Sequence, residues 1–220
     1  MTAADVNVVS PVLAAILTAL AILVVDLALP NRPTPVLVAA LVGLAATAAV
    51  TIAVGSGAAT TAFGGMYKLD ALTTFLDLLF ISIVAMTIVF APDYLAPRNL
   101  PVAEFSVVLV FAMCGAMVIA ASADLLLLFL GLELMVLPGY LLAGYHKSDN
   151  FSTEGAIKYF LLGSFSSAIF LFGLAFVWGM TGTTNIAAVA SALQAIVAGN
   201  AALQPGLALG LAFMTTGVAF

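Results

Sequence analysis

Residues 131–140, GLELMVLPGY, carry one acidic side chain in an otherwise uncharged apolar run. Glu133 follows Asp124 by nine residues, which is about 14 Å along an α-helix at a rise of ~1.5 Å per residue. Burial favours the protonated form of a carboxyl group, whereas a nearby ammonium favours the ionised form. Glu133 is therefore expected to serve either as a structural acid that hydrogen-bonds to a neighbouring helix or as a group on a proton or ion path.

Pro138 and Lys158 are the residues whose chemistry bears most directly on Glu133. Pro138 clashes with the carbonyl of Leu134 and so favours a helix break beside the carboxylate; it serves either helix geometry alone or the function of Glu133. Lys158 follows Glu154 by four residues, a spacing that favours an ion pair on one helix face. Lys158 is thus expected either to pair with Glu154 at the membrane surface or to face Glu133 across the bundle.

Other polar side chains could assist the same chemistry. Asp77 either anchors the third helix at the membrane surface or faces a partner inside the bundle. Ser164 lies beyond Lys158, among hydroxyls that point to several faces, and His146 is expected to cap the end of the fifth helix, where a cation suits the helix dipole. Asp26, Asp124 and Glu154 are expected to reach water near helix ends. The single cysteine, Cys114, is expected to be a small buried apolar residue.

Composition indicates which solvent surrounds these groups. Of the 220 residues, 65% are hydrophobic and 7% are charged, against about 45–50% and about 25% in soluble domains. Uncharged runs such as residues 105–122 are long enough for membrane-spanning helices. The chain holds no HExxH, CxxC, GxGxxG or P-loop pattern, and nothing in it suggests a metal site, a bound cofactor or nucleic acid as a partner.

The pattern predicts an all-α bundle with about six complete spans and part of a seventh. Each span needs roughly 17–25 apolar residues, and Gly, Pro and charged residues mark the breaks. We expect a glycine-rich hairpin in the interfacial loop 55–70 and a short amphipathic surface helix over 181–203. The final helix begins near Pro205 and is still apolar at Phe220, so we expect a longer protein. The expected spans cover residues 8–29, 35–54, 71–91, 103–122, 124–145 and 153–179.

Basic residues near the span ends predict the orientation of the bundle. Arg32, Arg98 and Lys147 fall in the first, third and fifth loops, and Lys68 alone falls in the opposite set. Cytoplasmic loops carry an excess of Lys and Arg. We therefore expect the N-terminus outside a bacterial inner membrane, with the first helix retained as a span because no basic residue precedes it.

Two longer stretches resemble a known family. The runs ASADLLLLFLGLELMVLPGYLLAGY and STEGAIKYFLLGSFSSAIFLFG, supported by FGGMYKLDALTTF, APDYLAPRNLP and GMTGTTNI, resemble the antiporter-like membrane subunits of respiratory complex I, and most of all subunit N of bacterial NADH:quinone oxidoreductase. The resemblance begins near residue 60. Residues 1–102 are then the first three helices, and residues 103–220 are the first part of an inverted-repeat, proton-translocating unit.

The resemblance implies a non-redox subunit that relays protons through buried Glu and Lys charges. In that family the fifth-helix glutamate, here Glu133, pairs with a lysine on a broken seventh helix, in a motif similar to GVAF; the partner would follow Phe220. Lys158 matches the sixth-helix lysine. Asp77 departs from the pattern, since many relatives have a basic residue near that point. NADH, FMN, iron–sulfur clusters and quinone would lie elsewhere in the complex, and the other membrane-arm subunits and the lipid bilayer would be the partners.

Two rival functions remain open on the sequence. A subunit of a related multi-subunit Na+/H+ antiporter would carry the same glutamate and lysine. A membrane scaffold that transports nothing would use its buried charges only to fix helix packing.

Overall fold

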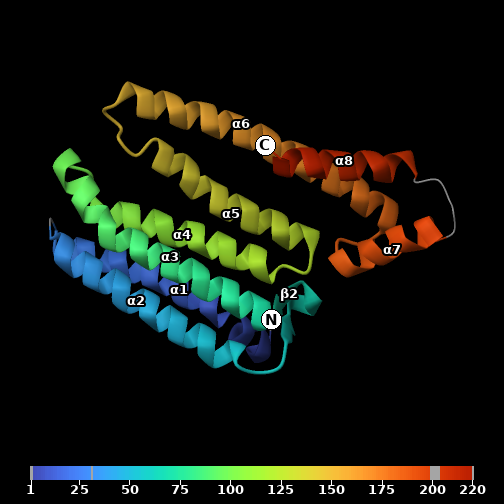
Figure 1. The fold of residues 1–220 in the computed structure, drawn as a ribbon, viewed down its shortest axis with the longest axis horizontal. Helices are drawn as coiled ribbons and strands as arrows, with labels where there is room; N and C mark the ends of the chain where they lie inside the picture. Colours follow the sequence, from blue (N-terminus) through green and yellow to red (C-terminus); the bar gives the residue numbers. More distant parts are fainter. Residues whose placement is uncertain (1, 31, 199–203, 220) are drawn as a thin grey trace.

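The computed structural model describes residues 2–30, 32–198 and 204–219, and in these the chain forms an elongated stack of helices (Figure 1). A small hairpin interrupts the helices after the second span. The elements in chain order are α1 (Ala3–Ala28), α2 (Pro33–Gly55), β1 (Thr60–Ala62), η1 (Phe63–Gly65), β2 (Tyr67–Leu69), α3 (Ala71–Leu95), η2 (Ala96–Arg98), α4 (Val102–Ala121), α5 (Leu125–Ala143), α6 (Asn150–Thr181), α7 (Ile186–Ala198) and α8 (Pro205–Ala219).

Aspartates begin three of the long helices. Asp70 accepts a hydrogen bond from the backbone N–H of Thr73 at the start of α3, and Asp124 does the same for Leu126 at the start of α5. Asp149 accepts from two backbone N–H groups at the start of α6. The first N–H groups of a helix have no partner within it, so these side chains supply acceptors where lipid would supply none.

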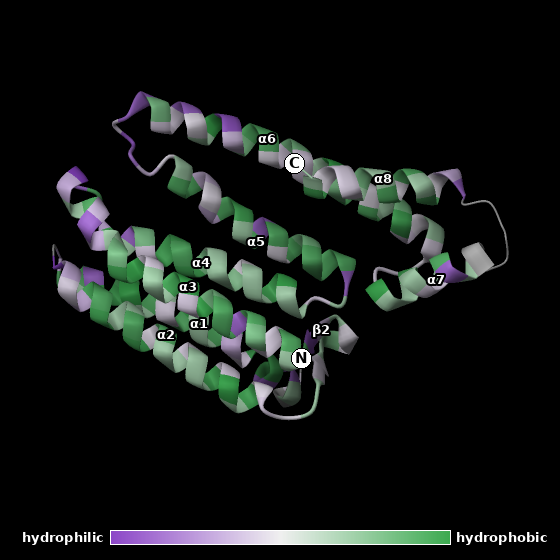
Figure 2. Cartoon of the chain, in the orientation of Figure 1, coloured by the Kyte–Doolittle hydropathy of each residue, from purple (hydrophilic) through white to green (hydrophobic). Residues whose placement is uncertain are grey.

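The polar connections gather at the two ends of the stack, and apolar residues cover the helices between them (Figure 2). At one end the β1–β2 hairpin meets the α4–α5 connection, where the N–H of Ala123 donates to the carbonyl of Met66 at 2.8 Å. At the other end the hydroxyl of Tyr145 donates to the carbonyl of Pro101, which ties the α5–α6 loop to the α3–α4 loop. Alternate loops therefore share an end, as successive membrane crossings require.

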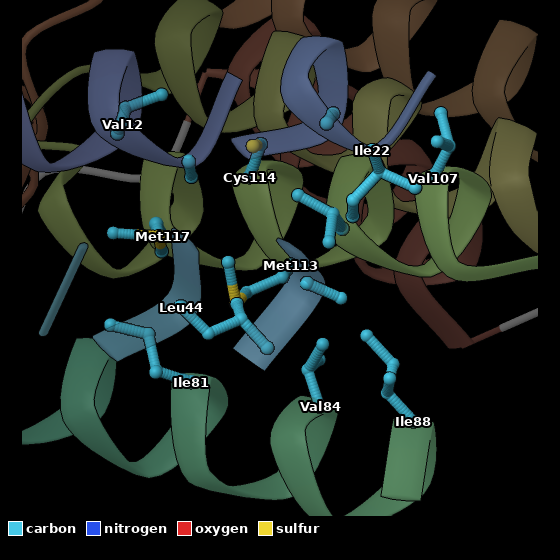
Figure 3. Close-up of a cluster of buried hydrophobic side chains, with 14 of the residues drawn as sticks. Val12, Ile22, Leu44, Ile81, Val84, Ile88, Val107, Met113, Cys114 and Met117 are labelled. Atoms are coloured by element: carbon cyan, nitrogen blue, oxygen red, sulfur yellow. The ribbon is translucent and has the colours of Figure 1, made fainter. Parts of the chain in front are cut away.

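Helices α1 to α4 pack into one bundle around an apolar core (Figure 3). The labelled side chains include Leu44 of α2, Ile81 of α3 and Met113 of α4, and each is at most 5% exposed. Cys114 has no exposed surface in this core, which confirms its prediction as a small buried residue. The β1–β2 hairpin closes one end of the bundle, with Tyr67 and Leu69 each 2% exposed.

Helices α5, α6 and α8 form the other side of the stack (Figure 1). Helix α5 approaches α4 at Gly115, where a side chain would collide with the backbone of Met135. Helices α6 and α8 meet at Gly173, where an added Cβ would lie 2.6 Å from the carbonyl oxygen of Gly210. Small residues at such contacts let helix backbones approach closely within a membrane.

The predicted architecture is confirmed, with shifts of a few residues at the helix ends. Six helices of the described part are long and apolar enough to cross a membrane, and the expected hairpin and final helix are present. Helices α1 and α6 are longer than expected because Thr2 and Asp149 provide N-caps outside the apolar runs. The short surface helix predicted over 181–203 is α7, which begins later, at Ile186; residues 199–203 lie outside the described part.

Candidate functional site

Glu133 lies beside a cavity of about 220 Å³ between α5, α6 and the last turn of α8. Its side chain is half-buried, and no described group donates a hydrogen bond to its carboxylate. The same cavity is lined by the hydroxyl-bearing residues Tyr140, Tyr159, Ser166 and Ser167. A carboxylate beside hydroxyl groups can exchange a proton with them or with water, and the proton path and the structural acid both stay predictions.

Tyr140 is an enclosed polar residue beside the Glu133 cavity. Its side chain is 7% exposed, and its ring meets the ring of Tyr159 edge to face with centroids 4.9 Å apart. The Tyr140 hydroxyl occupies the place that a side chain at Gly163 would take. Gly163 was expected from the sequence to allow close helix packing, but Tyr140 was missed, because the contact joins α5 to α6 and no local spacing signals it.

Ser166 connects the cavity to α8. Its hydroxyl donates to the carbonyl of Gly217 at 2.5 Å, and Gly217 packs directly against the backbone of Phe170. Val218 lines the cavity one residue later. The last described turn of α8 therefore lies at the level of Glu133.

Lys158 does not line the Glu133 cavity. Its ammonium pairs with the carboxylate of Glu154, and both side chains are largely exposed, at 73% and 58%. The geometry is the surface pair that the four-residue spacing predicted as one of two alternatives. Pairs of this kind on an exposed helix face contribute little to stability, about 0.3–0.5 kcal/mol.

Two accessory residues predicted from the sequence, Pro138 and Ser164, do not line the Glu133 cavity. Pro138 is buried within α5, which continues through it to Ala143, so the expected helix break at this residue was wrong. Ser164 is exposed and does not line the cavity, whereas Ser166 and Ser167 of the same helix do.

His146 is not the cap of α5, and that expectation was wrong. The C-cap is Gly144, whose N–H bonds to carbonyls of the last turn, because the chain turns away two residues before the histidine. His146 instead borders a cavity of about 700 Å³ together with Arg98 and Tyr145. Burial, and then the charge of Glu104, raises the pKa of Tyr145 to about 12, so this phenol stays a donor at neutral pH.

Two aspartates are buried, one of them against expectation. Asp124 does not reach water: it is 4% exposed, and it accepts hydrogen bonds from the N–H of Leu126 and from the hydroxyl of Thr184 at 2.6 Å. The α6–α7 connection covers it, which the sequence could not indicate. Asp77 faces the interior of the α1–α4 bundle with no exposed surface, so the bundle-facing alternative holds and the surface anchor does not.

Metal binding finds no support in residues 2–30, 32–198 and 204–219. No three His, Cys, Asp or Glu side chains in these ranges lie close enough together to hold an ion.

Comparison with known proteins now places the chain. Residues 122–220 match the family described as NADH:quinone oxidoreductase/Mrp antiporter, TM. NADH-quinone oxidoreductase subunit N 2 of Rhizobium meliloti is 36% identical over 181 residues, which are 82% of this chain and 36% of that protein. The chain belongs to the antiporter-like family of membrane subunits.

Two chains of solved membrane complexes have the same fold as this chain. A chain of respiratory complex I from Thermus thermophilus superposes with a TM-score of 0.70 at 26% identity, over 95% of this chain and 43% of that one. A chain of the Mrp complex from Dietzia sp. DQ12-45-1b superposes with a TM-score of 0.67 at 22% identity, over 100% and 41%. The chain spans less than half the length of the curated relatives that it matches.

Proposed function

We propose that this chain is the first part of subunit N of a proton-pumping NADH:quinone oxidoreductase in a bacterial inner membrane, and that it helps to carry protons across. The observation that carries the proposal is the Glu133 cavity between α5, α6 and α8. It puts an acid that forms no hydrogen bond to the described residues within a helix that could cross the membrane. The subunit N relative from Rhizobium meliloti supports the choice of complex.

Glu133 is the group that takes up and releases the proton. A carboxyl between apolar walls changes protonation when a neighbouring charge approaches or withdraws. The hydroxyls of Ser166 and Tyr140 border the same cavity, and a hydroxyl can accept one proton while it donates another. They are therefore suited to pass a proton between Glu133 and water.

The last turn of α8 is where the partner charge implied by the family resemblance would enter. Gly217 and Val218 line the Glu133 cavity, so a lysine that continues this helix after Phe220 would start near Glu133. Such an ammonium would favour the ionised carboxylate, and its withdrawal would favour proton uptake. Lys158, held by Glu154, would serve as a charge relay once that surface pair opens.

In this proposal, residues 1–102 form the scaffold helices and residues 103–220 form the first part of the translocating repeat. The chain itself would hold no redox group. NADH, FMN, iron–sulfur clusters and quinone would act in other subunits, and the other membrane-arm subunits would contact the apolar faces exposed along α5 and α6, including Leu137, Leu141 and Phe165.

Glu133→Gln tests the proposal in the assembled complex. The amide keeps the shape of the side chain and cannot exchange a proton in the working pH range, so proton translocation into vesicles should fall on the order of 100-fold. The control is Glu104→Gln, the same change on an exposed carboxylate in the first turn of α4, which should leave translocation unchanged. Full translocation by Glu133→Gln, in a complex of normal subunit content, would mean that the acid is structural.

A sodium/proton antiporter subunit is the second candidate, because the matched family also covers Mrp antiporters and the Dietzia Mrp chain shares the fold. Purification of the full-length protein with its native partners separates the two. Co-purification with rotenone-sensitive NADH oxidation supports the respiratory complex, whereas sodium-dependent proton exchange without NADH oxidation supports the antiporter.

A further inference from the structure

Asp77 is a buried acid that the proposed function does not use. It lies on α3, seven residues after the N-cap Asp70, on the face that packs against α2 and α4. Its side chain has no exposed surface. Neither carboxyl oxygen has a hydrogen-bond partner among the described residues.

Tyr67 is a second buried polar group of the same bundle without a partner. It lies on β2, which closes the hairpin end of the bundle, and it is 2% exposed. Its hydroxyl also forms no hydrogen bond within the described part of the chain. Burial raises the pKa of Tyr67, and the charge of Asp77, when ionised, raises it further. The phenol and the carboxyl therefore lie within electrostatic reach of each other, and the phenol keeps its proton.

No described cation is placed to balance a charge on Asp77. On β2, Lys68 is engaged by Asp70 at 2.8 Å, outside the core. Helix α2 carries no charged residue between 33 and 55. The remaining titratable groups on the elements packed against α3, and on α3 itself, are the buried Cys114 thiol of α4 and, toward the opposite end, Glu104, Asp93, Tyr94 and Arg98.

The buried face of α3 that holds Asp77 continues with the apolar side chains of Ile81 and Val84. Ile81, one turn further along α3, packs in the cluster with Leu44, Met113 and Met117 (Figure 3). An isolated carboxylate in such a medium is strongly disfavoured unless a cation or several donors meet it. Because Asp77 has no exposed surface in this chain, a second subunit docked on the outside could not contact it with a lysine or arginine.

We propose that Asp77 is a proton-binding site of the α1–α4 bundle, separate from Glu133, which holds its proton at neutral pH. The protonated acid places no net charge in the core. Its O–H donor and acceptor oxygens would match the phenol of Tyr67, the other buried polar group of this bundle without a partner among the described residues.

A proton fits this site better than a metal ion. Hard cations take six or more oxygen ligands, and Asp77 with Tyr67 supplies three oxygens. The site therefore has enough oxygen atoms to hold one proton but too few to ligate a hard cation.

Infrared difference spectroscopy of the assembled complex, with aspartate labelled by ¹³C at its side-chain carboxyl carbon, tests this assignment. At neutral pH the wild-type complex should show a label-sensitive C=O band of a protonated acid, which Asp77→Asn removes. Tyr67→Phe should keep the band, because the proton belongs to Asp77 itself. The control Asp93→Asn changes an exposed aspartate of the same helix and should remove only a carboxylate band.

Either of two results would overturn the assignment. The first is the absence of any label-sensitive acid band from the wild-type complex at neutral pH, a measurement that needs no variant to fold. The second is an acid band that Asp77→Asn leaves in place. A band that disappears when sodium is added would identify a cation site and would equally refute the proton site. These spectra do not depend on pumping, so they stand apart from the Glu133 experiment.

Discussion

Glu133 and Asp77 are carboxyl groups within helices of spanning length, and their surroundings give them different chemistry. Glu133 is half-buried beside a cavity with four hydroxyl-bearing side chains. Asp77 has no exposed surface and no hydrogen-bond partner among the described residues. A group that must exchange protons quickly needs a route to water. In the roles that we propose, Glu133 exchanges its proton, whereas Asp77 holds its own.

Gly163→Ala tests how closely Tyr140 packs against α6 beside the Glu133 cavity. The added methyl group would occupy the position of the Tyr140 hydroxyl, so Tyr140 must move and its packing against Tyr159 is lost. Overpacking of this kind costs about 1–3 kcal/mol, and thermal unfolding in detergent should show a lower midpoint.

The matched control for this change is Gly155→Ala, eight residues earlier on α6. Nothing lies near its added methyl group, and alanine is the better helix former by roughly 1 kcal/mol. The midpoint should stay or rise. A fall of equal size in both variants would show that the Tyr140 contact is not what Gly163 protects.

At the scale of single residues, depth along a helix could be predicted, but the direction in which a side chain points could not. A soluble helix shows its buried face by a polar opposite face. Here both faces are apolar, so the sequence left Asp77 between the surface and the bundle, and it gave no reason to prefer Ser166 to Ser164. Tyr140 was missed for a related reason, since its partner Gly163 lies on another helix.

Helix ends carry the polar bonds that fix the elements in place. Asp70 caps α3 while it pairs with Lys68 of β2, so one carboxylate joins the hairpin to the helix. The hydrogen bond from Lys68, followed by that from the N–H of Thr73, lowers the pKa of Asp70 to about 2. Since an unfolded aspartate has a pKa of about 3.9, the folded state favours the ionised form.

The stability that comes from ionised Asp70 should follow pH accordingly. It is fully present above about pH 4 and is lost as the pH falls toward about 2, because the unfolded chain binds the proton first. The unfolding midpoint of Asp70→Asn should therefore lie below that of the wild type at pH 6, and the two should converge between about pH 4 and 2. Circular dichroism in detergent measures both midpoints.

Lys68→Met provides the check on the cause. Removing the ammonium removes the first reason for the low pKa of Asp70, so the midpoint of this variant should begin to fall at a higher pH than that of the wild type. An identical pH profile for Lys68→Met and the wild type would mean that the N-terminus of α3 alone keeps the pKa of Asp70 low.

At the scale of elements, the sequence predicted the spans well because apolar length is a direct property of the chain. The ends of α1 and α6 were less accurate, since Thr2 and Asp149 extend these helices beyond their apolar runs. His146 was assigned to the end of α5 by its charge, but the chain leaves the helix at Gly144. Contacts between loops, such as that of Asp124 with Thr184, are set by the fold and leave no local signal.

In the whole molecule, the two ends of the stack carry unequal charge. The end that holds the α1–α2, α3–α4 and α5–α6 connections has Arg32, Arg98 and Lys147, and the hairpin end has Lys68 paired with Asp70. Basic residues concentrate in cytoplasmic loops. The hairpin, and with it the Tyr67 side of the Asp77 site, should therefore face the outside of the cell.

Cysteine labelling can test this orientation, because the single native cysteine, Cys114, is fully buried. Lys147→Cys and Gly57→Cys place an exposed thiol in the α5–α6 loop and before the hairpin. A membrane-impermeant maleimide should label position 57 from outside intact spheroplasts and position 147 only in inverted vesicles, with the wild type unlabelled in both. The reverse pattern would place the hairpin in the cytoplasm.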